Sequence, residues 1–189
     1  MSSDDLDETL MDAELKMTAA VEHTRSEFGK IRTGRANPQL ITDLPVEYYG
    51  TPTPLQQLAS VSVPDPRMLL VSPYDRSALK EIERAISRSD LGLNPSNDGS
   101  VVRVVFPDLT EERRKQFVKI ARDRAEDSRV GIRNTRRSAR ASIGKLADAG
   151  EVPDDDAARA EARLQELTDR YVADIDGLLA NKEKELLEV

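Results

Sequence analysis

The 189-residue sequence has no cysteine, no tryptophan and a single histidine. Without cysteine the chain can form neither a disulfide nor a thiolate metal site, which is compatible with a reducing cytoplasm. No apolar run approaches the roughly 18 residues that span a bilayer, and the acidic, polar first ten residues differ from a secretory signal. We therefore expect a soluble, cytoplasmic protein that does not enter a membrane.

Residues that commonly carry catalysis are equally scarce. His23 lies among charged residues of an expected helix, where a solvated side chain is the simplest interpretation. There is no HExxH zinc motif and no nucleophile elbow, and Gly144 and Lys145 lack the remaining residues of a phosphate-binding loop. The acidic run at 154–156 fits a helix start. We therefore predict that the chain is not an enzyme and holds no metal or cofactor.

Charge is what the sequence has in quantity. Charged residues make up 33% of the chain, hydrophobic residues 38%, and the net charge is -7. This composition suits long, solvated helices better than one thick core, yet it contains too many hydrophobic residues for simple disorder. The length allows one large domain or two small ones.

Three long amphipathic helices are predicted from the spacing of apolar residues. The first runs over residues 6–31 and ends by Gly34. The second runs over 110–149, with Thr110 as its N-cap, Gly150 as its stop and heptads of small residues along its inner side. The third follows Pro153. Its expected buried residues are Ala160, Leu164, Leu167, Tyr171, Ile175, Leu178 and Leu186.

The pattern changes between residues 34 and 108, where most of the prolines lie. Short runs rich in β-branched residues predict strands, Asn97-Asp98-Gly99 predicts a tight turn, and a period of three to four predicts one helix. The expected strands are 46–49, 58–63, 68–72 and 101–105, the helix is 75–89, and 50–54 is a turn or extended loop.

These elements predict an α+β fold with two domains. Residues 1–32 and 108–189 would form an antiparallel-type three-helix bundle, and 33–107 would form an inserted β/α/β domain. Because the chain passes between the domains twice, we expect a two-stranded hinge. Its predicted residues are Thr33, Gly34, Phe106 and Pro107.

Residues 128–145 form the most unusual stretch, with six basic residues and no acid in an acidic chain. Arg129, Arg133, Arg136 and Arg140 recur at helical spacing and therefore share one side of a helix, and Arg137 lies beside them. One interpretation is a solvated face that pairs with acids of the last helix, at Glu161 or Glu166. The other is an anion-binding surface for folded RNA, since no aromatic residues are interleaved for single-strand stacking.

Five motifs in register resemble the bacterial ribosome recycling factor family, and the resemblance covers essentially the whole chain. They are KIRTGRANP at 30–38, EYYGTPTPL with QLAS at 47–60, SDLGLNP at 89–95, LTEERRK at 109–115 and RNTRR at 133–137.

The resemblance implies an L-shaped molecule whose bundle contacts large-subunit ribosomal RNA, with the Arg133 and Arg136 positions the most important. It adds Lys30, Arg32 and Arg35 to the RNA-facing surface. It implies a factor, expected to be a monomer, that binds the post-termination ribosome and splits the subunits with elongation factor G and GTP. Initiation factor 3 would act afterwards.

Two other classes of function remain open at this point. The chain could be a structural coiled-coil adaptor whose arginine face pairs with an acidic protein, or a hydrolase that uses carboxylates of the 33–107 segment. Salt-sensitive binding to RNA would distinguish the first from a ribosome-binding factor, and mutation of every carboxylate in that segment would test the second.

Overall fold

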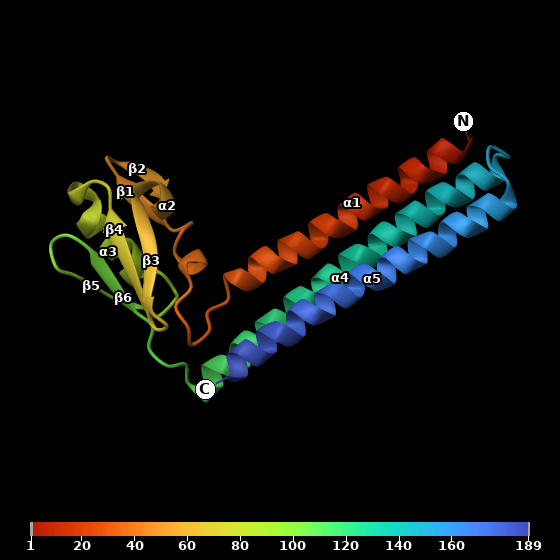
Figure 1. Ribbon diagram of the computed structural model, residues 1–189. Coiled ribbons are helices and arrows are strands. Elements are labelled where there is room, and N and C mark those ends of the chain that lie inside the picture. Colours follow the sequence, from red (N-terminus) through yellow and green to blue (C-terminus); the bar gives the residue numbers. More distant parts are fainter. Residues whose placement is uncertain (1, 189) are drawn as a thin grey trace. The chain divides into compact units, whose positions relative to one another are not determined.

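A computed structural model describes residues 2–188, and Figure 1 shows its helices and strands. The chain folds into two compact units. One consists of Met1–Phe28 and Lys119–Glu183, and the other of Gly29–Val118 and Lys184–Val189. The predicted α+β fold, a helical bundle with a small antiparallel sheet, is confirmed. The predicted domain boundaries at 32/33 and 107/108 stay a prediction.

The helical unit is built from three long helices that lie side by side (Figure 1). Contacts between their ends fix their directions: Asp7 lies 3.7 Å from Arg163, and Arg122 lies 2.6 Å from Glu183. The first and last helices are therefore parallel, and the middle helix is antiparallel to the last. The helices are α1 (Ser2–Gly29), α4 (Glu111–Asp148) and α5 (Asp154–Leu187).

Small residues allow α4 to pack closely in the bundle. Its buried residues are Ala121, Ala125, Ile132, Ala139 and Ile143. The first four lie at predicted heptad positions and Ile143 does not, and small residues let helix backbones approach. A partly buried hydrogen bond joins α4 to α1, where the Thr24 hydroxyl donates to Ser128 Oγ at 2.7 Å.

The predicted ends of α4 are confirmed by their capping contacts. The backbone N–H of Arg113 donates to Thr110 Oγ1 at 3.2 Å, so Thr110 is the N-cap. Gly150 follows the helix with a positive φ of 70°, a conformation that glycine adopts without strain. Thr110 and Gly150 therefore explain why the sequence locates this helix to within a residue at each end.

The other unit contains a β-hairpin and a four-stranded antiparallel sheet in the order β3-β4-β6-β5. Inward residues alternate along the central strands, and they pack against α3 through Leu79, Ile82 and Ile86. The strands are β1 (Pro45–Tyr48), β2 (Thr51–Pro54), β3 (Ala59–Asp65), β4 (Met68–Pro73), β5 (Asn94–Asn97) and β6 (Val102–Val105). The helices are η1 (Pro38–Leu40), α2 (Leu55–Leu58), η2 (Arg76–Ala78) and α3 (Leu79–Arg88).

Three sequence expectations differ from the structure. The first helix ends at Gly29 and not by Gly34, although Ile31 beyond its end is still buried. The loop expected at 50–54 contains β2, paired with β1 in a hairpin. β5 and α2 were not predicted, because these four-residue segments, one containing Pro95 and the other following Pro54, carry neither strand alternation nor a helical period. Within residues 2–188, no helix is both long and apolar enough to cross a membrane.

Gly131, in the middle of α4, can be replaced without steric conflict. A Cβ added there would meet no heavy atom within 4 Å, and its φ is helical. We expect Gly131→Ala to raise the free energy of unfolding by about 0.5–1 kcal/mol, measured by urea denaturation, because alanine loses less backbone entropy in a helix. Gly150→Ala, at a positive φ, is the control and should destabilise. A loss of stability in Gly131→Ala would contradict this description of α4.

Candidate nucleic-acid interface

The predicted arginines of α4 fall on the outer side of a helix that runs without interruption through Gly131. The buried alanines and isoleucines occupy the inner side, so the positions between them project outward. Arg133, Arg137 and Arg140 are exposed, whereas Arg129 and Arg136 are partly buried. The structure therefore brings all five together along one helix.

Arg129 is held tightly inside the bundle surface. Its side chain is only 17% exposed, and it donates to Asp176 Oδ1 at 2.7 Å and to Glu126 Oε2 at 2.8 Å. Burial alone would lower the pKa of Arg129, but its hydrogen bonds to these two carboxylates and the attraction of their charges together outweigh burial and raise the pKa. The guanidinium is therefore a fixed, neutralised part of the α4–α5 contact.

Arg140 also pairs with α5, through Glu161 Oε2 at 3.1 Å. This confirms part of the first interpretation, in which the arginine face pairs with acids of the last helix. The pair is exposed, and such pairs contribute little to stability. Arg140 can therefore exchange its partner for another anion at small cost.

The remaining predicted arginines of α4 make fewer or longer contacts with carboxylates. Arg133 Nη1 lies 3.5 Å from Glu126 Oε1, a carboxylate already shared with Arg129. Arg136 donates to the neutral amide of Gln165 at 3.0 Å, and its buried Nε has no partner. Within residues 2–188, Arg137 has no hydrogen bond or ion pair. Arg133, Arg136 and Arg137 thus keep donors available for phosphate, and we call these three the open arginines.

The basic residues after α1 belong to the other compact unit. Lys30 is exposed, and the exposed side chain of Arg35 lies 3.9 Å from Glu188, a loose ion pair. Arg32 differs from both, because only 6% of it is exposed. Its guanidinium is directed at backbone carbonyls inside the unit, so burial argues against a direct contact with RNA, and the RNA contact of Arg32 stays a prediction. The sequence pattern missed this burial because arginine is almost always exposed.

The predicted hinge residues differ in how firmly they are packed. Gly34 has open space around it, and Thr33 Oγ1 accepts from the Arg35 backbone N–H at 3.2 Å. Phe106 is 1% exposed and belongs to the core of its unit, and its N–H donates to Arg67 O at 2.8 Å. Pro107 accepts a hydrogen bond from Arg32. Bending at these residues stays a prediction.

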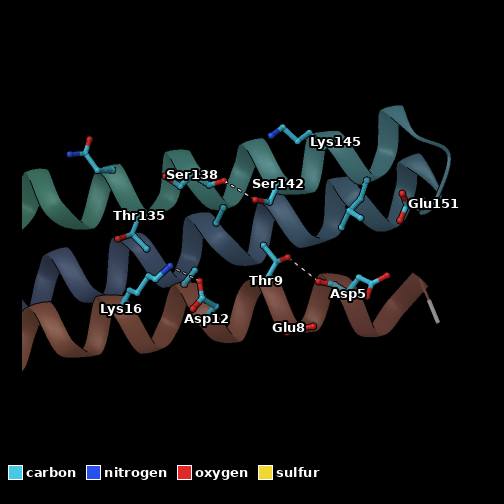
Figure 2. A pocket seen from close by; sticks show the side chains of 14 residues that line it. Asp5, Glu8, Thr9, Asp12, Lys16, Thr135, Ser138, Ser142, Lys145 and Glu151 are labelled. Atoms are coloured by element: carbon cyan, nitrogen blue, oxygen red, sulfur yellow. Dashed lines mark hydrogen bonds and ion pairs between the residues drawn. The ribbon is translucent and has the colours of Figure 1, made fainter.

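A polar groove of about 910 Å³ runs between α1 and α4 beside this surface. Figure 2 shows acids of α1, such as Asp5 and Asp12, on one wall and hydroxyls of α4, such as Ser138 and Ser142, on the other. Lys16 pairs with Asp12 at 2.7 Å, and Lys145 lies on the α4 wall. The groove was not predicted, because which α1 residues face which α4 residues depends on helix packing.

The arrangement of arginines is suited to binding anions. In the described part of the chain, no three His, Cys, Asp or Glu side chains are grouped to hold a metal ion. Arginine forks bind phosphate oxygens in pairs and without regard to sequence. The fold is α+β, and a row of arginines on a bundle helix is suited to binding phosphate, which is typical of a nucleic-acid-binding protein.

Comparison with known proteins shows the family to which the chain belongs. The family model described as Ribosome recycling factor matches residues 24–187. Ribosome-recycling factors of Thermobifida fusca and Acidothermus cellulolyticus are 54% and 56% identical to this chain, each over 97% of it and the whole of the relative. The chain belongs to the ribosome recycling factor family, as its motifs predicted. Membership makes it a translation factor and not an enzyme.

Solved structures agree with this assignment. A solution structure of the ribosome recycling factor is 40% identical, with a TM-score of 0.78 and coverage of 97% of this chain and 98% of the other. The Thermus thermophilus factor, in models with Escherichia coli elongation factor G bound to the Escherichia coli post-termination complex, is 46% identical. Its TM-score is 0.68, with 97% of this chain and 99% of that chain covered.

Arg129 and Arg133 should differ in what they contribute to folding. We expect Arg129→Ala to lower the free energy of unfolding by about 1 kcal/mol, because it leaves Asp176 and Glu126 without their closest partner. Arg133→Ala should change it by less than about 0.5 kcal/mol. Urea denaturation at low salt measures both. Equal losses would show that Arg133 is as deeply committed to the bundle as Arg129.

Proposed function

We propose that the chain binds the post-termination ribosome through large-subunit ribosomal RNA and, with elongation factor G and GTP, separates the subunits. The observation that carries the RNA contact is the set of open arginines on α4, which keep donors free in an otherwise acidic protein. The complex of the Thermus thermophilus relative with elongation factor G and a post-termination ribosome supports the choice of partners.

In this mechanism, binding to RNA anchors the bundle while another protein supplies the movement. α4 gains stiffness from packing against α1 and α5, so arginines fixed along it present several cations in a set geometry and lose little entropy on binding. Elongation factor G supplies movement through its own GTP hydrolysis. The unit that contains the sheet transmits this movement, with residues 33–107 as the moving domain and Thr33, Gly34, Phe106 and Pro107 as its hinge.

Further basic residues and another translation factor take part in recycling. Exposed Lys30 and Arg35 extend the RNA-binding surface, together with Arg140 and the open arginines. Arg129 borders this surface, with its charge already paired to Asp176 and Glu126. Initiation factor 3 keeps the subunits apart afterwards. The chain acts as a monomer in the cytoplasm, where translation takes place.

Ribosome binding should depend on individual open arginines. We expect Arg133→Ala and Arg136→Ala each to weaken cosedimentation with large subunits about tenfold or more, because each removes a charge-assisted contact of ~1.5 kcal/mol. The slope of log K against log salt should fall by about 0.7–0.9 per lost phosphate contact. Helix content by circular dichroism should be unchanged.

Arg163→Ala is the matched control, because Arg163 is an exposed arginine of α5 with only a loose pair to Asp7. It should sediment like the unsubstituted chain. Equal sedimentation of all three variants would contradict the RNA contact. Polysome breakdown with purified chain, elongation factor G and GTP tests the function as a whole, and failure to release monosomes or subunits would overturn it.

A further inference from the structure

Arg32 is the one arginine among residues 2–188 whose side chain is buried. It follows α1, yet its guanidinium contacts two segments far along the chain. Nη1 donates to Leu91 O at 3.1 Å, and Nη2 donates to Pro107 O. The guanidinium carbon also lies 5.9 Å from the centre of the Phe106 ring, a cation–π contact.

These contacts join the segment that leaves α1 to the segment that leads into α4. Arg32 belongs to the segment that leaves α1, and Pro107 to the segment that leads from β6 into α4. Leu91 follows α3 on a third segment. One planar group therefore holds three segments through backbone carbonyls, and the fixed fork of a guanidinium suits two acceptors that lie apart.

The backbone around Leu91 is shaped to receive this group. Gly92 has a positive φ of 65°, and a Cβ there would lie 3.5 Å from Arg32 Nη1. That distance is an ordinary contact, so the restriction to glycine comes from the φ angle. The turn at Gly92 thus lets the Leu91 carbonyl approach the guanidinium closely.

A buried arginine of this kind is costly. No carboxylate pairs with it, its buried Nε has no hydrogen-bond partner within residues 2–188, and burial, followed by the like charge of Arg113, lowers its pKa. An apolar side chain of similar length would fill the space without removing a charge from water. The cost is therefore better explained by what the fork holds in place than by packing.

We propose that Arg32 is a positioning residue for ribosome recycling, a clamp that ties the connection into α4 to the connection out of α1 so that both move together. This inference rests on the proposed function. It also replaces the direct RNA contact predicted for Arg32. The clamp has no role in holding the ribosome, and its effect appears when elongation factor G drives movement.

Two substitutions separate the clamp from other roles. Arg32→Met keeps the length and loses both hydrogen bonds, whereas Arg32→Lys keeps the charge and replaces the fork with a single ammonium. Arg76→Met, an exposed arginine of the same unit, is the control. Each variant is measured by hydrogen exchange of backbone amides, by cosedimentation with large subunits, and by polysome breakdown with elongation factor G and GTP.

We expect amide exchange at 91–93 and 108–110 to be at least tenfold faster in Arg32→Met, with exchange in the central strands unchanged. Cosedimentation should stay within twofold, and polysome breakdown should slow at least tenfold. Arg32→Lys should fall between Arg32→Met and the unsubstituted chain.

Three results would overturn the clamp. Cosedimentation lost as fully as in Arg133→Ala would make Arg32 an RNA contact. Faster exchange throughout the unit in both variants would make it a general core residue. Unchanged local exchange or unchanged breakdown would remove the role altogether. If the unsubstituted chain itself failed to recycle, the proposed function would fall, and the exchange data would still decide whether Arg32 clamps the connections.

Discussion

Close packing along the inner side of α4 is the constraint on which the arginine surface depends. Ala121, Ala125 and Ala139 let neighbouring backbones approach, and Ile132 and Ile143 fill the space between. Because inner positions of a helix recur every three to four residues, fixing them also fixes which residues project outward. A helix held along its length by two neighbours can then carry a row of like charges whose mutual repulsion would disfavour it in isolation.

Carboxylates of the bundle pair with some arginines of α4 and leave others without an ion pair within residues 2–188. Carboxylates of α5 and of α4 itself pair with Arg129 and Arg140, as the first interpretation of the arginine stretch expects. RNA binding, the second interpretation, stays a prediction. Arg136 and Arg137 meet no carboxylate among residues 2–188. Fewer arginines are therefore unpaired than the sequence suggests. The unpaired ones lie between Arg129 and Arg140, which carboxylates hold in place.

Helix ends are predicted best from the sequence where a single residue determines the local backbone conformation. Thr110 and Gly150 locate α4 because a cap and a positive φ act within one turn. Strands β3, β4 and β6 were predicted from short runs rich in β-branched residues. β5 and α2 have no such signal, and the end of α1 was misplaced because Ile31 continues the apolar period after the helix has stopped.

The site was predicted less completely than the fold, for a physical reason. Charge spacing identifies which residues share a helix face, but the partner of each charge comes from another helix or segment. That Arg129 is neutralised by Asp176 and that Arg32 is buried against Leu91 and Pro107 depend on contacts 47 to 75 residues apart. The family motifs identify the protein class, and the structure shows which arginines are already paired or buried.

The central claim is that the arginine side of α4 lies against large-subunit RNA during recycling. The natural absence of cysteine makes this directly measurable, because Ser138→Cys, between Arg137 and Arg140, can carry an iron chelate as the only label. On post-termination ribosomes, hydroxyl radicals from this position should cleave large-subunit RNA strongly, and those from Ala173→Cys on exposed α5 only weakly. Cleavage from Ala173→Cys with none from Ser138→Cys would contradict the account.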